Sequence, residues 1–215
     1  MRKLVSLFLV STLLVACTSE KNPLLDPSSA EWTKSAPAEF TIKIETTQGN
    51  FEIDIKRENA PLGVDRFYNL VRLGYYNDAR FHRVVPGFIT QFGLAGNPEH
   101  TQVWMNQPIA DDPNKVSNTR GTIAFAFTES GTRTTQLYIN MVDNSRLDAG
   151  GFAPLGRITK GMDIVDEIYS GYGETSGGGV RRGDQSKIVA QGNVYLDKEF
   201  PLLDHLIKAS ILEKN

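Results

Sequence analysis

The sequence has one cysteine and three histidines among its 215 residues, and this scarcity excludes two kinds of site. Because Cys17 is the sole thiol, no disulfide can form within the chain, and the core alone must hold the folded domain together. His100 and His205 lie far apart with no ligand spacing, so we expect no metal. The glycines at 177–179 are followed by neither Gly-Lys-Ser nor Gly-Lys-Thr, so they form no phosphate-binding loop, and we expect no cofactor.

The N-terminus lacks an apolar run long enough to cross a bilayer. Met1-Arg2-Lys3 is basic and precedes about a dozen mostly apolar residues, Leu4 to Val15, a length typical of a secretory signal rather than a spanning helix. Leu14-Val15-Ala16-Cys17 resembles the lipobox of bacterial lipoproteins, in which the cysteine becomes the acylated first residue. We therefore predict a lipoprotein signal peptide at 1–16 and lipidation of Cys17. The alternative is a buried N-terminal helix that ends in an inert thiol.

The chain also lacks an excess of basic charge. It has 23 Lys and Arg against 25 Asp and Glu, and removal of Arg2 and Lys3 with the signal leaves 21 basic side chains and a net charge near −4. This balance argues against a nucleic-acid partner. We expect the protein to reach the membrane through the lipid on Cys17. The lipobox resemblance thus predicts a lipid-anchored protein of the bacterial cell envelope, and Thr18 in place of Asp after the cysteine favours the outer membrane, facing the periplasm, if the source is diderm.

Residues 17–39 differ in composition from the rest of the chain. They are rich in Ser, Thr, Pro, Glu, Lys and Ala, and their sizeable apolar side chains are Leu24, Leu25 and Trp32. Such a composition is typical of a flexible tether. We expect this tether to connect the lipid to a single folded domain at 40–215.

Alternation of apolar and polar residues predicts a mainly β domain. Phe40 to Thr47 and Phe51 to Ile55 alternate in this way around Gln48-Gly49-Asn50, which indicates a hairpin. Many antiparallel strands with few helices favour a closed β-barrel capped by helices. The other strands are expected at 81–85, 88–92, 121–127, 137–140, 153–158, near 187–190 and at 194–197, and the helices at 61–74, 162–169 and, as an amphipathic terminal helix, 201–212.

The stretch from Phe81 to Gln91 carries the strongest functional signal. In a strand, neighbouring side chains point to opposite faces, so Arg83 stands clear of the residues beside it. A Pro-Gly turn follows, after which Phe88, Ile89 and Gln91 can fold back toward Arg83. This arrangement puts a fixed fork of donors, an apolar surface and an amide in a small area, which suits the binding of a peptide around a proline.

Several linked motifs, in this order along the chain, extend the signal: Gly74-Tyr75-Tyr76, the stretch 81–91, Gly121-Thr122-Ile123-Ala124-Phe125-Ala126, Thr135-Gln136-Leu137-Tyr138-Ile139-Asn140, and Leu147-Asp148 leading to Gly151-Phe152-Ala153-Pro154-Leu155-Gly156. From about Phe40 to Gln191 the chain thereby resembles the cyclophilins, which are peptidyl-prolyl cis-trans isomerases. The resemblance implies an all-β fold in the main, a closed eight-stranded antiparallel barrel capped by two α-helices. A C-terminal helical extension would follow.

The resemblance also implies the site residues. Arg83 and Gln91 would be the catalytic residues, with Arg83 as the cation and Gln91 on the substrate backbone. The substrate-binding residues would be Phe88, Ile89, Tyr138, Leu147 and Phe152 in a proline pocket, Ala126, Phe127 and Thr128 along the substrate backbone, and Gln136 in the groove.

Some positions depart from the family pattern. Phe127 stands where many members have Asn, Leu137 and Tyr138 where they have Phe, and Phe152 where many have His. Backbone groups at 127 can serve a peptide whatever the side chain. Arg146 replaces a Trp of some members, which weighs against tight binding of the family's macrocyclic drug.

The implied function is isomerisation of Xaa-Pro bonds in proteins that fold outside the cytoplasm, with proline-containing segments of client proteins as partners. The alternative is a non-catalytic chaperone or adaptor of the same fold that grips such segments. Arg83 and Gln91 favour catalysis, whereas Phe127 and Leu137 leave room for the binder. A third class is an assembly component in which the barrel is only a scaffold.

Other polar residues have plainer interpretations. Alternation sends His82 away from Arg83, which predicts a hydrogen-bonded interior histidine rather than an acid or base. Asp111-Asp112 precedes a proline and is expected to form a turn. Glu129 and Arg133 are expected to be exposed to solvent.

Overall fold

The computed structural model describes residues 22–177 and 185–212. The predicted signal peptide and the lipidation site Cys17 lie outside the described residues. Within them, no helix combines the length and apolar character needed to cross a bilayer.

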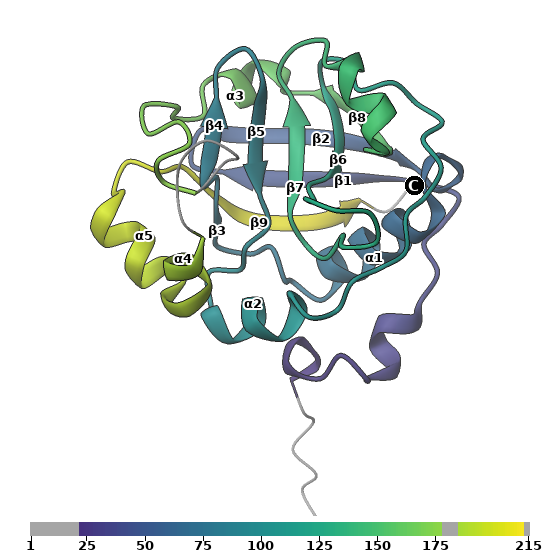
Figure 1. The fold of residues 1–215 in the computed structure, drawn as a ribbon, viewed down its shortest axis with the longest axis horizontal. Coiled ribbons are helices and arrows are strands. Elements are labelled where there is room, and N and C mark those ends of the chain that lie inside the picture. The colour runs from purple at the N-terminus through teal and green to yellow at the C-terminus, as the bar shows by residue number, and fades with distance from the viewer. Residues whose placement is uncertain (1–21, 178–184, 213–215) are drawn as a thin grey trace, which may run out of the picture.

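One curled antiparallel sheet forms the body of the molecule (Figure 1). Its strands lie in the order β3-β9-β1-β2-β8-β6-β7-β5-β4. Their bounds are β1 (Glu39–Thr46), β2 (Gly49–Lys56), β3 (Ala79–Arg80), β4 (Arg83–Val85), β5 (Ile89–Phe92), β6 (Thr122–Phe125), β7 (Leu137–Asn140), β8 (Pro154–Lys160) and β9 (His205–Leu212). The mainly β, antiparallel fold is therefore confirmed. The predicted closed barrel of eight strands is not confirmed, because the described residues give nine strands, and β3 and β4 end the order without pairing to each other.

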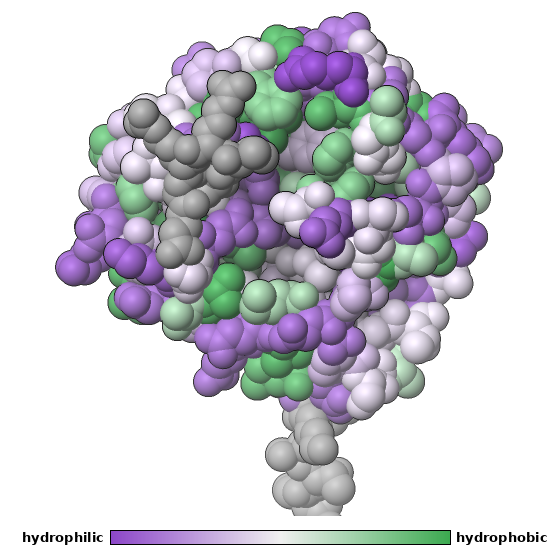
Figure 2. All heavy atoms as spheres, in the orientation of Figure 1, coloured by the Kyte–Doolittle hydropathy of each residue, from purple (hydrophilic) through white to green (hydrophobic). Residues whose placement is uncertain are grey.

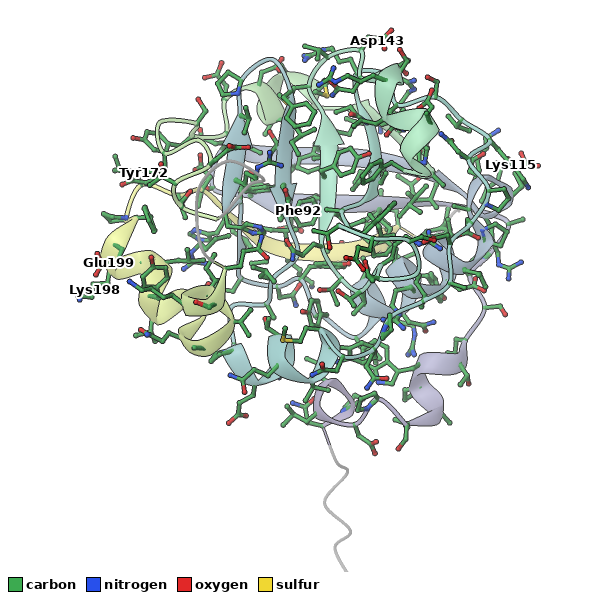
Figure 3. The ribbon with its side chains drawn as sticks, in the orientation of Figure 1. Phe92, Lys115, Asp143, Tyr172, Lys198 and Glu199 are labelled. Atoms are coloured by element: carbon green, nitrogen blue, oxygen red, sulfur yellow. The ribbon has the colours of Figure 1, made fainter. Side chains whose placement is uncertain are left out.

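The first hairpin forms as its alternation predicts. In β1 and β2, Phe40 lies opposite Ile55, and Ile42 lies opposite Ile53. Residues directly opposite one another share a face of the sheet, and all four of these side chains lie buried on the face that points into the core. Further into the core, Phe92 makes edge-to-face contacts with Tyr76 and Phe81, and Figure 3 shows it near the centre of the molecule.

Two predicted helices are present. Helix α1 (Pro61–Arg72) packs on β9 and buries Val64, Phe67, Leu70 and Val71. Helix α3 (Met162–Asp166) packs on β2 and is shorter than the predicted 162–169.

The first turn of α1 explains the Asp111-Asp112 pair. Ala60 provides no side-chain cap, and the Asp112 carboxylate instead accepts hydrogen bonds from the backbone N–H groups of Leu62 and Gly63, at 2.9 and 2.8 Å. Arg133 donates to the same carboxylate at 3.0 Å. Its side chain is 1% exposed, so the predicted exposure of Arg133 is wrong. The pair of aspartates is thus more than a turn, since it ties the 128–134 loop to the helix.

The C-terminal predictions are wrong in element type. Helix α4 (Ser186–Gln191) replaces the expected strand near 187–190, and helix α5 (Asn193–Glu199) replaces the expected edge strand at 194–197. Together with α2 (Pro98–Trp104), these helices form one side of the molecule (Figure 1). Ile188 of α4 and Leu196 of α5 pack in a small apolar cluster with Leu94 and Leu203, so the apolar residues of these two helices are buried outside the main core.

The expected terminal helix at 201–212 is strand β9, which lies between β1 and β3. A register shift occurs where β1 passes from Glu45, opposite Lys208, to Thr46, opposite Leu206. The extra residue in β9 lets Leu206 and Ala209 both face the core although they are three positions apart. That spacing is the one a helix would produce, which is why the sequence pattern misleads.

Residues 22–36, expected to belong to a flexible tether, pack on the domain instead. They contain the short 3-10 helices η1 (Pro23–Leu25) and η2 (Ala30–Thr33). The ring of Trp32 lies 3.9 Å from that of Trp104 between centroids, and the Trp104 indole N–H donates to the Leu24 carbonyl at 2.9 Å. The tether prediction is therefore wrong for this segment, because one tryptophan offsets its polar composition.

Candidate active site

Strand pairing places three of the predicted site residues in one row. Arg83 on β4 lies opposite Gln91 on β5, Gln91 lies opposite Tyr138 on β7, and Tyr138 lies opposite Ala124 on β6. Residues directly opposite each other point to the same face of a sheet. Arg83, Gln91 and Tyr138 therefore share one face, and the register of four strands fixes their spacing.

The guanidinium of Arg83 is held at its edges. Its Nη1 donates to Oε1 of Gln91 at 3.0 Å. Its Nε donates to Oε1 of Glu174 at 3.2 Å, and its Nη2 donates to the same oxygen. Its carbon lies 5.6 Å from the centre of the Phe88 ring, a cation–π contact. The Arg83 side chain is only 10% exposed. These contacts fix its planar cation beside the apolar ring of Phe88.

A chain of amides extends from Gln91. Its Nε2 donates to Oε1 of Gln136 at 2.9 Å, and Nε2 of Gln136 donates to Oε1 of Gln185 at 3.0 Å. Nε2 of Gln185 donates in turn to the Gly177 carbonyl at 2.8 Å. Each amide is thereby oriented by its neighbour. The orientation of Gln91 follows from the cation, because its oxygen must accept from Arg83.

Beside this polar row lies an apolar cluster. Ile89, Ala124 and Tyr138 are buried in it, and the partly buried Phe88, Ala126, Leu147 and Phe152 pack against them. Figure 2 shows hydrophobic atoms gathered on this face of the molecule. The sequence-predicted pocket residues Phe88, Ile89, Tyr138, Leu147 and Phe152 thus lie together.

The 126–128 segment borders this cluster. The Ala126 N–H donates to the Gln136 carbonyl at 2.9 Å, and the Phe127 ring stacks on Phe152 with 4.3 Å between centroids. Thr128 is exposed. Phe127 therefore adds to the apolar surface.

Tyr138 presents its ring, and not its hydroxyl, to the cluster. The hydroxyl donates to Oδ1 of Asn118 at 2.8 Å, and burial raises the pKa of Tyr138 far above its usual value. Asn118 is itself fixed, because its Nδ2 donates to Asp148 at 2.8 Å and to the Phe152 carbonyl at 2.7 Å. Tyr138 is thus suited to shape a pocket and unsuited to transfer a proton.

Comparisons with known proteins agree with this geometry. A sequence model of the cyclophilin type peptidyl-prolyl cis-trans isomerase/CLD family matches residues 41–192. The chain belongs to the cyclophilin family. The described part of this cyclophilin holds no group of three His, Cys, Asp or Glu side chains placed to bind a metal.

Curated relatives support the assignment. Over 133 residues this cyclophilin is 38% identical to the peptidyl-prolyl cis-trans isomerase A of Dickeya dadantii, a match that covers 59% of this chain and 70% of that protein. It is 35% identical to the isomerase B of Escherichia coli over 136 residues, which is 59% of this chain and 82% of that protein. The protein is therefore a peptidyl-prolyl cis-trans isomerase.

A solved structure supports the fold. The cyclophilin type isomerase of Cryptosporidium parvum superposes with a TM-score of 0.59 at 17% identity and covers 82% of this chain and 99% of its own. At this identity the likeness concerns the fold alone.

His82 is interior in this cyclophilin, as predicted, but not hydrogen-bonded as predicted. Neither ring nitrogen has a well-aligned hydrogen-bond partner among the described residues. Burial lowers the pKa of His82 to about 4, so the ring is neutral at pH 7. The ring points to the opposite side of the chain from Arg83 and fills space in the interior of the domain.

Sequence reasoning missed Glu174 and Gln185. Both lie in the chain after Phe152, beyond the motifs that carry the resemblance, and both contact the site: Glu174 binds Arg83, and Gln185 binds Gln136. Neither residue stands at a recognisable spacing from Arg83 in the sequence. No local signal could have found them, since 91 residues separate Glu174 from the cation it binds.

Proposed function

We propose that Arg83 and Gln91 are the catalytic pair of this isomerase and that the apolar cluster is its proline pocket. The observation that carries the proposal is the single row of Arg83, Gln91 and Tyr138 across β4, β5 and β7 beside that cluster. In this arrangement the pyrrolidine ring of the substrate packs on apolar side chains that include Phe88, Ile89, Leu147 and Phe152. The carbonyl of the same prolyl residue accepts a hydrogen bond from the Arg83 guanidinium.

The chemistry requires no nucleophile. The obstacle to rotation of an Xaa-Pro bond is amide resonance, with a barrier of about 20 kcal/mol. Twisting localises a lone pair on the prolyl nitrogen. A donor that interacts more strongly with the twisted amide than with either planar form lowers the barrier. Arg83 can act in this way because two of its five N–H groups, one on each terminal nitrogen, make no hydrogen bond to the described residues.

One cation does not supply the whole effect. A ten-thousandfold acceleration corresponds to about 5 kcal/mol. A charge-assisted hydrogen bond contributes roughly 1.5 to 3 kcal/mol net. The remainder comes from the pocket, which holds the ring still while the flanking peptide binds to Gln91, Gln136 and the 126–128 segment.

We further propose that the protein acts on proteins that fold outside the cytoplasm and is anchored through a lipid on Cys17 in the bacterial envelope. The basic and apolar N-terminus and the Leu14-Val15-Ala16-Cys17 motif support this. Because residues 22–36 pack on the domain, residues 17–21 alone separate the lipid from the packed part. At about 3.5 Å per residue, that length keeps the domain within roughly 20 Å of the bilayer.

The catalytic assignment is tested on the chain without its signal and with Cys17→Ser. A protease-coupled assay of an Ala-Pro peptide should show that the protein accelerates isomerisation. Arg83→Ala should lower kcat/KM at least 100-fold, while the affinity for the peptide falls far less. Equal losses in rate and binding would remove Arg83 from the catalytic role. A protein that binds the peptide and leaves the uncatalysed rate unchanged would instead be a binder. The anchor is tested separately, since radiolabelled fatty acid that persists in Cys17→Ser would contradict it.

A further inference from the structure

The two catalytic residues lie in the middle of a longer hydrogen-bonded chain. In order, its members are Glu174, Arg83, Gln91, Gln136 and Gln185. Glu174 and Gln185, which occupy the two ends, both come from the C-terminal part of the chain that leads into α4. We propose that Glu174 is a positioning residue that orients the Arg83 guanidinium for isomerisation, with Gln185 fixing the other end of the chain. This inference rests on the catalytic role proposed for Arg83.

The contact of Glu174 with Arg83 restricts the cation. One carboxylate oxygen of Glu174 accepts hydrogen bonds from both Nε and Nη2 of Arg83, and the side-chain oxygen of Gln91 accepts one from Nη1. A planar group held on two edges cannot turn about its Cδ–Nε bond without breaking a bond on one of them. The two remaining N–H groups therefore point in fixed directions, which is the condition for acting on a twisted amide without reorganisation.

Burial makes this contact stronger than an ordinary surface pair. The Arg83 side chain is 10% exposed and that of Glu174 is 21% exposed, so both charges are largely removed from water. A neutral prolyl carbonyl is a weaker acceptor than a carboxylate and will not displace it. Substrate must therefore bind to the free N–H groups while Glu174 stays in place.

The backbone that carries Glu174 is itself fixed against β4. Ser176 Oγ donates to the His82 carbonyl at 2.8 Å. A Cβ at Gly177 would lie 2.2 Å from that carbonyl oxygen and 2.4 Å from the His82 ring, so only glycine fits there. On its outer side, Tyr172 packs edge-to-face on Phe200 after α5, and Figure 3 shows it on that side of the molecule. Glu174 is thus delivered by a segment anchored at both sides.

Substitutions of Glu174 test the inference. Glu174→Ala should lower kcat/KM about tenfold, with the loss in kcat, while the Kd of a ground-state peptide measured by NMR titration stays within twofold. Glu174→Gln keeps an oxygen that can accept both bonds and should recover kcat/KM to within threefold of the parent. Glu174→Asp is one methylene short and should resemble Ala. The exposed Glu167→Gln, in the same part of the chain, is the matched control and should change nothing.

A spectroscopic signature separates positioning from general stabilisation. The Nε–H signal of Arg83 should be protected from exchange in the parent and in Glu174→Gln, and lost in Glu174→Ala at an unchanged melting temperature. A Glu174→Ala protein as active as the parent, or more active, would overturn the inference. If Arg83→Ala is inactive in that case, the proposed catalytic role stands. An active Arg83→Ala would overturn the catalytic role itself.

Discussion

Arg83 and Gln91 face each other across β4 and β5, and the Nη1 group of Arg83 donates to Oε1 of Gln91 at 3.0 Å. This bond determines what Gln91 can offer a substrate. Its oxygen is committed to the cation, and one of its two amide N–H groups is committed to Gln136. The second N–H makes no hydrogen bond to the described residues, so Gln91 can donate it to a peptide carbonyl.

Gln91→Glu keeps the shape of the side chain and removes that donor. We expect kcat/KM to fall at least tenfold, because the carboxylate pairs with Arg83, loses the bond to Gln136 and repels the substrate carbonyl. The protease-coupled assay measures the loss. Gln102→Glu, an exposed position on α2, is the matched control and should retain the parent rate. Full activity of Gln91→Glu would show that this amide does not contact the substrate.

Tyr138→Phe should leave the activity nearly intact. The hydroxyl is turned toward Asn118, and the ring alone borders the pocket, so kcat/KM should stay within twofold. Loss of one buried hydrogen bond should lower the free energy of unfolding by about 1 kcal/mol, measured by urea titration. Phe152→Ala, which removes a ring that touches both Phe127 and Tyr138, should lower kcat/KM at least tenfold. Equal effects of the two substitutions would contradict this division of roles.

The parts of the fold and site that sequence could predict are those set by short-range patterns. The alternation of Phe40, Ile42 and Ile44 specifies a buried face, and the turn after Val85 brings Gln91 back opposite Arg83. Both depend on residues within about ten positions of each other, where strand periodicity and turn geometry decide the outcome. The pocket residues beyond that range came from the resemblance to cyclophilins.

The errors arise where a distant contact decides the structure. Leu206 and Ala209 imitate helical spacing because a register shift against β1 inserts an extra residue. Arg133 looks like a surface residue until it is placed beside Asp112, and Trp32 is partly buried because Trp104 packs against it. In each case the partner lies in another element, so no local window of sequence contains the information.

Asp112→Ala should be strongly destabilising. It removes the acceptor for two N–H groups at the start of α1 and leaves the buried guanidinium of Arg133 without this partner. We expect a loss of about 3 to 5 kcal/mol in the free energy of unfolding. Glu129→Ala, at an exposed position of the 128–134 loop that also carries Arg133, should change the free energy of unfolding by less than about 0.5 kcal/mol. A small effect of Asp112→Ala would mean that water or another group caps the helix.

His82 connects stability to pH through its burial. The folded protein holds the ring neutral, with a pKa lowered to about 4 mainly by desolvation and further by the charge of Arg83. In the unfolded chain the ring titrates near 6.5. Between these two values the unfolded chain binds a proton that the folded chain does not. Unfolding therefore becomes easier as the pH falls through this window, and the contribution levels off below pH 4.

A comparison of the parent protein with His82→Gln at pH 7 and pH 5 isolates this effect. The free energy of unfolding of the parent should fall by about 2 kcal/mol more between the two pH values than that of the variant, because glutamine does not titrate. Urea titrations at both pH values provide the measurement. The two proteins are compared by the change in their free energy of unfolding between pH 7 and pH 5, so a variant that is less stable at both pH values still answers the question. Identical pH dependence of the two proteins would show that the ring is protonated equally easily in the folded and unfolded states, and hence that it is not shut off from solvent beneath Ser176 and Gly177.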